Sequence, residues 1–504
     1  MSIAEDEEGF DEAVALGSSR GLGGMVLRGS MWLLLARVVR SVLSLVGLAI
    51  LARLLQPSDF GVLVMALTFT FLGTVLLMGM LDAPLTRHLG MKQEDLRGLI
   101  WLGLILMFLL GATLWIAAPW LEVAMRFPRL ALGIRAVTPV LLLQTYMIAG
   151  TAVLRRLHRF GMVAALSILN ILFYLVPAIA LAALGFGLWS VLAGQVIAAL
   201  VTAIQFVRAA RLPLTPPRRL SLGEIGQTGW YGVGTKLVEF AVTSVDTLAV
   251  ALTMGPATTG IYSRAYNIGI QIKEPFTAVD STIRQALAKL KDEAGYRREI
   301  DRIVRLIVIA SALIVAGVFA AREEIVQILL GQKFAAAAPI LAFILLALPA
   351  RTLMLTIEGA TVARGNMVNA LARTILTLSI ITPGVFIGAR YGAEGVAVAV
   401  ATASWAGALF ALKLFARDMK RSYWSLVGLL LPGLGIGLTM AALGVWMEHS
   451  VAGLPPVARL ALVIALFAIV SAFIGIALPE SWLPRVGNEV RRRAWRMVGL
   501  GPPA

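Results

Sequence analysis

The amino-acid sequence predicts an all-α polytopic membrane protein. Apolar residues make up 59% of the chain and charged residues only 14%. The mean hydropathy of +0.87 is far above that of soluble proteins. Long apolar runs recur along most of the chain, which contains no cysteine and therefore no disulfide, catalytic thiol or thiolate metal site.

The apolar runs are numerous enough for about 14 transmembrane helices, because one span needs about 20 apolar residues. We expect these spans at roughly 31–55, 61–85, 98–118, 133–154, 162–184, 187–207, 228–254, 260–283, 303–321, 338–361, 367–388, 394–416, 424–447 and 457–478. The span at 260–283 fits least well, because it contains four charged residues.

The charged loops predict the orientation of the chain. Lys and Arg gather in alternate loops, such as 155–159, 208–219 and 413–421, whereas the loops expected at 56–61, 185–187 and 255–260 are short and nearly uncharged. This positive-inside asymmetry places both termini in the cytosol. It also accounts for the net charge of +16 through topology and anionic lipid, so no nucleic-acid partner is expected.

The first apolar run contains two arginines. Arg37 and Arg40 stand three residues apart, so they share one face of the helix, and Ser44 continues that face. A charged side chain at the centre of a bilayer helix costs about 2.5–3.5 kcal/mol, which predicts water or an anion beside this face. Alternatively, Arg37 snorkels to the cytosolic interface, from which it is only about 9 Å distant along the helix.

The chain divides into two related halves. A proline-rich linker at 211–227 separates an N-lobe (25–210, helices 1–6) from a C-lobe (228–418, helices 7–12). An offset of 199 residues pairs Pro57–Gly61 with Pro256–Gly260. Six spans per half predict parallel repeats, and such transporters bind substrate between their halves. Helices 13–14 (419–478) are an appendage, between a disordered cytosolic tail at 1–24 and a basic amphipathic cytosolic tail at 479–504.

Polar stripes mark three spans of the second half. Lys236, Glu239, Thr243 and Asp246 follow a +3, +4, +3 spacing; Arg264, Asn267, Gln271 and Glu274 repeat it; and Arg351 and Glu358 are seven residues apart. Each set lies on one helix face, and such faces should line a water-filled cavity. Alternatively, Lys236 and Glu239 form a purely structural ion pair, while Asp246 either pairs across helices or titrates.

The charges in these stripes suggest two roles. Arginine suits phosphate through its planar fork, so we expect a cationic substrate-binding cavity formed by Arg37, Arg40, Lys236, Arg264 and Arg351. The candidates for ion coupling are Glu239, Asp246, Glu274 and Glu358, because burial favours protonation of a carboxylate. The three histidines are far apart and no P-loop is present. The sequence therefore predicts a transporter without catalytic residues, metal or cofactor.

Several segments resemble the bacterial polysaccharide transporter family. They are Gly29–Trp32, Leu51–Gly61, Gly185–Gln195 and Glu324–Phe334, and the likeness extends over roughly residues 25–420. This family comprises the Wzx-like oligosaccharide flippases of the multidrug/oligosaccharidyl-lipid/polysaccharide exporter superfamily. The resemblance implies two six-helix lobes around a central cavity, two extra helices, and alternating access.

The resemblance also implies a substrate and a place in the cell. The expected activity is transfer of an undecaprenyl-diphosphate-linked oligosaccharide from the cytosolic to the periplasmic leaflet of the bacterial inner membrane, for exopolysaccharide, capsule or O-antigen. Further expected partners are the lipid bilayer, a proton or sodium ion, and polysaccharide polymerase and chain-length proteins. The alternatives are a drug/cation antiporter, a lipid II flippase, and a membrane polysaccharide polymerase or ligase.

Overall fold

In the computed structural model, the protein is built from α-helices with short 3-10 turns. The structure describes residues 22–87, 93–217, 223–288, 292–363, 367–450 and 453–477. Both expected tails lie almost wholly outside these ranges. The described chain contains no β-strand, which confirms the all-α prediction.

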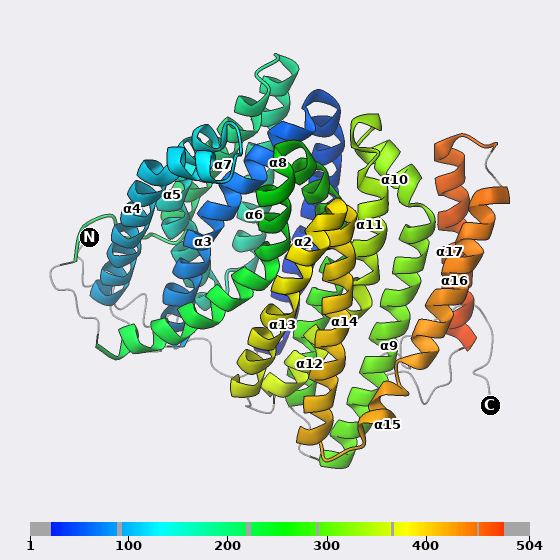
Figure 1. The fold of residues 1–504 in the computed structure, drawn as a ribbon. Coiled ribbons are helices and arrows are strands. Elements are labelled where there is room, and N and C mark those ends of the chain that lie inside the picture. Colours follow the sequence, from blue (N-terminus) through cyan, green and yellow to red (C-terminus); the bar gives the residue numbers. More distant parts are fainter. Residues whose placement is uncertain are drawn as a thin grey trace. The chain divides into compact units, whose positions relative to one another are not determined.

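The helices of the first half follow one another with short connections (Figure 1). They are α2 (Leu22–Leu54), α3 (Pro57–Arg87), α4 (Gln93–Ala124), α5 (Leu130–Arg156), α6 (Phe160–Ala183) and α7 (Leu188–Ala209). Each contains one of the first six expected spans to within one residue.

The second half begins with the 66-residue helix α8 (Gly223–Ala288). It continues with α9 (Glu293–Ala320), α10 (Arg322–Leu329), η1 (Gln332–Phe334), α11 (Ala337–Leu346), α12 (Leu348–Ala363), α13 (Met367–Gly388), η2 (Ala389–Tyr391), α14 (Gly392–Asp418), α15 (Tyr423–Val427), α16 (Leu431–Ser450) and α17 (Pro456–Ala477). Helix α8 combines expected spans seven and eight, which join at a kink where Gly255 has φ 76° and ψ −174°.

The number of membrane helices is compatible with the expected fourteen. Eleven stretches of the described chain are long and apolar enough to cross a membrane. Two of them, of 42 and 45 residues, each overlap two expected spans, and the shorter apolar helix at Pro456–Ser471 overlaps the last.

The chain forms two compact units. One comprises Met1–Ser244 with Met254–Gly260, and the other comprises Val245–Thr253 with Ile261–Ala504. The division thus falls within α8. The lobe boundary expected at the 211–227 linker stays a prediction.

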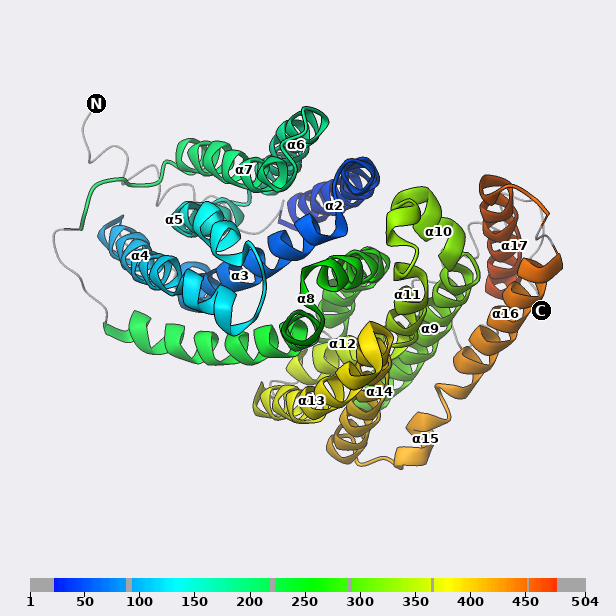
Figure 2. The same ribbon diagram turned by 45° about the horizontal axis from the view of Figure 1, so that its top comes forward.

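In the first unit, neighbouring helices pack through small residues. Helices α6 and α7 lie side by side, as do α4 and α5 (Figure 2). Gly150 on α5 allows this helix to approach Phe206 on α7, because a Cβ at this glycine would lie 2.8 Å from the phenylalanine side chain. Leu154, Val163 and Leu166 join Phe206 in a buried apolar cluster.

The starts of α3 and of the second part of α8 correct one expectation, since the sequence predicts loops at 56–61 and 255–260. Helix α3 instead begins at Pro57, where proline is favoured because its missing N–H needs no partner. The Gln56 N–H donates to the Asp59 carboxylate at 3.1 Å, which caps the helix. Pro256 follows the Gly255 kink in the same way.

The two helix starts touch each other reciprocally within the first unit. A Cβ on Gly61 would lie 1.9 Å from the carbonyl oxygen of Pro256, and a Cβ on Gly260 would lie 1.8 Å from that of Pro57. Only glycine permits so close a backbone approach. The segments that the 199-residue offset pairs in sequence therefore also pair in space.

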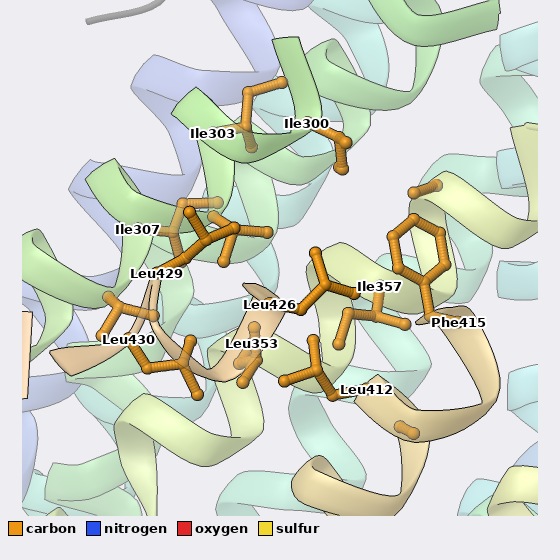
Figure 3. Packing of buried hydrophobic residues seen from close by; sticks show 14 of the residues in the cluster. Ile300, Ile303, Ile307, Leu353, Ile357, Leu412, Phe415, Leu426, Leu429 and Leu430 are labelled. Carbon is orange, nitrogen blue, oxygen red and sulfur yellow. The ribbon is translucent and has the colours of Figure 1, made fainter. Parts of the chain in front are cut away.

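The core of the second unit joins α9, α12, α14 and the short α15 (Figure 3). Ile300, Ile303 and Ile307 of α9 meet Leu353 and Ile357 of α12. Leu412 and Phe415 of α14, and Leu426, Leu429 and Leu430 from and after α15, complete the cluster.

The two appended helices pack onto this core. On α16, Cβ atoms on Gly437 and Gly444 would lie 2.8 and 2.4 Å from those of Ala312 and Ala320 on α9. This is the close small-residue packing typical of membrane helices. Helix α17 adds Phe467, whose ring lies against Gly317.

One ion pair anchors α17 to α10. Arg459 binds Glu324 at 3.1 Å, and the carboxylate residue is only 4% exposed.

Charged residues also end several helices. In the described chain, every non-glycine residue with positive φ is a basic residue: Arg126, Arg129, His158, Arg211 and Lys420. All except Arg129 lie two positions after the last residue of a helix, where a left-handed residue closes the last turn. The negative end of the helix dipole, which is the C-terminal end, also favours a nearby cation.

Candidate functional site

Two arginines expose their side chains from a membrane-spanning helix of the first unit. Arg37 and Arg40 both lie on α2 within the apolar stretch Trp32–Leu54, and both are exposed. Lipid penalises such charges strongly, so water or an anion beside this face, or snorkelling of Arg37 to the interface, stays the prediction. These are the two cations that the sequence places on one helix face.

The first part of α8 exposes an ion pair. Lys236 Nζ lies 2.6 Å from Glu239 Oε2, with 42% and 57% of the two side chains exposed. Thr243, one turn further, is exposed and donates to the backbone carbonyls of Glu239 and Phe240. The ion pair that the sequence offers as one alternative is thus present. The water-filled surface beside it stays a prediction.

Asp246 ends this stripe in a different environment, inside the second unit. It is only 1% exposed. Its Oδ2 accepts a hydrogen bond of 3.0 Å from the Tyr262 hydroxyl, and its Oδ1 accepts one of 2.7 Å from the Thr247 N–H. Asp246 therefore pairs across the Gly255 kink, with a partner from the second part of α8.

Arg351 on α12 extends this group into a network. Its Nη1 donates to the Tyr266 hydroxyl at 3.2 Å and its Nε to Ser404 Oγ at 3.4 Å. The rings of Tyr262 and Tyr266 stack at 6.3 Å, which connects Asp246 and its partner Tyr262 to Arg351. We call Asp246, Tyr262, Tyr266, Arg351 and Ser404 the polar network.

A small cavity borders the polar network. It has a volume of about 20 Å³, and Tyr266, Lys273 and Arg351 line it together with apolar residues of α8, α11 and α12. Such a volume holds about one water molecule. The cavity therefore has room for a water molecule or a small ion, and is too small for a sugar or a lipid headgroup.

The other predicted site residues lie outside these contacts. Arg264 is half-buried, with its Nε 3.5 Å from Ser263 Oγ. Glu274 accepts a 3.4 Å hydrogen bond from Thr277. Glu358 is exposed on α12. The structure thus links Asp246 to Arg351 through Tyr262 and Tyr266, and it pairs Lys236 directly with Glu239. The roles of all predicted residues stay predictions.

Three members of the polar network are absent from the sequence-based prediction. Tyr262 and Tyr266 are one helical turn apart, in the same span as the Arg264 stripe, and this spacing is the only signal that the sequence offers. Ser404 is 53 residues from Arg351, so only the fold reveals their contact.

Comparisons with known proteins agree with this architecture. The sequence pattern of a family described as "Polysaccharide biosynthesis protein" matches residues 50–339. The succinoglycan biosynthesis transport protein ExoT of Rhizobium meliloti (strain 1021) is 25% identical over 329 residues, which are 64% of this chain and 66% of that protein. The chain thus spans slightly less than two thirds of this relative's length.

Solved structures share the fold. The lipid II flippase MurJ, in an inward closed conformation, superposes with a TM-score of 0.72 at 13% identity, over 89% of this chain and 98% of MurJ. An inward-facing multidrug resistance MATE family transporter of the MOP superfamily superposes with a TM-score of 0.57 at 16% identity, over 78% of this chain and 98% of the transporter. Both likenesses concern the fold alone.

Proposed function

Because this chain belongs to the polysaccharide biosynthesis protein family, we propose that it is a flippase for an undecaprenyl-diphosphate-linked oligosaccharide. It moves this substrate by alternating access from the cytosolic to the periplasmic leaflet of the bacterial inner membrane. Both termini lie in the cytosol, as the basic loops require. The product serves exopolysaccharide, capsule or O-antigen synthesis.

The exposure of Arg37 and Arg40 on α2 carries this proposal. Two cations on one face of a membrane helix favour an anionic guest, and arginine binds phosphate oxygens through two parallel N–H groups. Lys236 adds a third exposed cation, although Glu239 neutralises part of it. A diphosphate headgroup presents the charge that these side chains need.

The polar network supplies the proposed coupling device. Asp246 is a buried carboxylate that Tyr262 and Tyr266 link to Arg351. Tyr266 and Arg351, in turn, line the cavity that holds about one water molecule. Through this network, Asp246 can exchange a proton or hold a small cation without contacting the glycan. Arg351 then stabilises the charged form of Asp246. Glu239, Glu274 and Glu358 remain further candidates for coupling.

An export assay tests the substrate site. In a strain that lacks the chromosomal gene, we expect Arg40→Ala to lower polysaccharide export while the protein still accumulates in the membrane. Arg208→Ala, at an exposed arginine near the end of α7, is the matched control and should support normal export. Normal export by Arg40→Ala would refute the role of this arginine.

Two further measurements separate substrate from coupling. Deletion of the gene should cause a lipid-linked oligosaccharide to accumulate in the cytosolic leaflet, whereas accumulation of lipid II or loss of drug resistance would identify another substrate. In proteoliposomes, Asp246→Asn should weaken the dependence of transport on a proton or sodium gradient. An unchanged dependence on both gradients would refute the coupling role.

A further inference from the structure

The turn between α4 and α5 contradicts the charge asymmetry that otherwise orients the chain. Both helices span the membrane, so the turn at 125–129 lies opposite the basic turn at 155–159. It nevertheless contains Arg126 and Arg129, and Arg135 follows on α5. All three side chains are exposed. Basic residues are disfavoured on the translocated side, so this group needs its own explanation.

Two of these arginines have a strained backbone. Arg126 has φ 49° and Arg129 has φ 66°, a conformation that glycine adopts freely and other residues rarely. The turn is held firmly, because Phe127 and Leu130 are fully buried and Glu122 accepts hydrogen bonds from the N–H groups of Arg129 and Ala131. The buried part of the turn thus presents two arginine side chains outward.

The third arginine lies against a tryptophan. Arg135 Nε donates to the Trp115 carbonyl at 3.3 Å, and its guanidinium lies 5.8 Å from the Trp115 ring centre. These contacts fix the guanidinium without using its two terminal nitrogens, which have no other partner among the described residues. Trp115 is exposed, and Trp120 is 73% exposed.

The composition of this surface matches a membrane interface. Exposed tryptophans settle at the level of the lipid headgroups, and the neighbouring Ile116 and Val123 are exposed apolar side chains that suit acyl chains. Within residues 115–135, three arginines and the single carboxylate of Glu122 leave a net positive charge. An anionic headgroup therefore complements both the charge and the apolar border.

We propose that Trp115, Trp120, Arg126, Arg129 and Arg135, together the arginine–tryptophan surface, bind the phosphate of a resident anionic phospholipid. This lipid lies in the leaflet opposite the basic loops. The surface is open, so its affinity for any single headgroup is modest. A resident phospholipid, unlike a rare cargo, is abundant enough in the bilayer to keep such a site occupied. The inference goes beyond the proposed transport function and uses only its topology.

Lipid binding by the full-length protein tests the proposal. Native mass spectrometry would follow phosphatidylglycerol binding in a background of phosphatidylcholine. The variant combines Arg126→Gln, Arg129→Gln and Arg135→Gln. Each basic side chain near an anionic surface contributes about fivefold to affinity, so we expect the triple variant to bind phosphatidylglycerol roughly 100-fold more weakly. Three Arg→Lys substitutions at the same positions should restore much of the binding, because the charge returns.

The matched control is Lys420→Gln, which changes an exposed basic residue of the same left-handed backbone type, at the end of α14. As a change of one basic residue, it should weaken phosphatidylglycerol binding by no more than about fivefold. Equal binding by wild type and triple variant, or an equal loss in Lys420→Gln, would overturn the proposal. Preferential binding of undecaprenyl phosphate over phosphatidylglycerol at this surface would overturn the choice of a resident phospholipid.

A labelling experiment separates this proposal from the transport function. Because the chain has no cysteine, Arg129→Cys and Lys420→Cys each introduce a single thiol. An impermeant maleimide added to intact spheroplasts should label Arg129→Cys but not Lys420→Cys. The reverse pattern would refute the topology of the proposed flippase and would overturn the placement of the lipid in the leaflet opposite the basic loops. Loss of export in a variant with the expected labelling would concern the transport function alone and would leave the lipid site supported.

Discussion

The hydrogen bond from Tyr262 to Asp246 can be tested by replacing Tyr262 with phenylalanine. The substitution removes only the hydroxyl, which donates to Asp246 Oδ2 at 3.0 Å. Tyr262 is fully buried and Asp246 is 1% exposed, so water cannot replace the lost donor. A hydrogen bond to a charged group contributes about 1.5–3 kcal/mol, and we expect Tyr262→Phe to lower the free energy of unfolding by this amount.

A second background isolates the charged part of this interaction. Asp246→Asn keeps the size of the side chain and removes its negative charge, so the bond from Tyr262 becomes neutral and contributes about 0.5–1.5 kcal/mol. Tyr262→Phe should therefore cost about 1 kcal/mol less in the Asp246→Asn background than in the wild type.

Reversible unfolding in mixed micelles, followed by circular dichroism, would measure the four free energies. Tyr391→Phe, at a tyrosine that is 78% exposed, is the control and should leave stability unchanged. A Tyr262→Phe cost below about 0.5 kcal/mol, or an equal cost in both backgrounds, would refute the argument that this bond stabilises a buried charge.

Three further predictions concern packing and helix ends. Gly61→Ala forces a Cβ to within 1.9 Å of a backbone carbonyl, so we expect a large loss of folded protein in fluorescence-detected size exclusion, and Gly260→Ala should cause the same loss; normal yields of both would contradict the contact. Arg459→Gln leaves Glu324 buried and unpaired, which should cost about 3–5 kcal/mol in the same unfolding assay, and adding Glu324→Gln should recover part of it. Lys420→Gly relieves a left-handed backbone and should raise the unfolding free energy by about 1 kcal/mol; an unchanged or lower value would contradict this expectation.

The membrane helices could be predicted from sequence because each depends on a local apolar run. The run at Trp32–Leu54 and the pair of Lys236 with Glu239, three residues apart, need no information from elsewhere in the chain. The ends of helices depend on finer chemistry. The sequence does not predict that α3 begins at Pro57, because proline and glycine in one short segment also favour a loop.

The polar network could be predicted only in part, because its contacts join distant residues. Asp246 stands out in the sequence as a carboxylate in mid-span. Its partner Tyr262 is 16 residues away along the chain. The two side chains meet only because α8 bends at Gly255. Arg351 stands out in the sequence as a charge within an apolar span, but its contact with Ser404 depends on how α12 packs against α14.

The reciprocal contact of Pro57–Gly61 with Pro256–Gly260 has the form of an interface between two identical chains. In a twofold-symmetric dimer, each patch meets its own copy, so residue i contacts j and j contacts i. Here Gly61 meets Pro256 while Gly260 meets Pro57, and the offset of 199 residues converts one contact into the other. A homodimer of six-helix chains would contain this contact by symmetry alone. In a fused chain the two segments are always present one to one, so their contact does not depend on protein concentration. The residues around each segment can then change independently of those around the other.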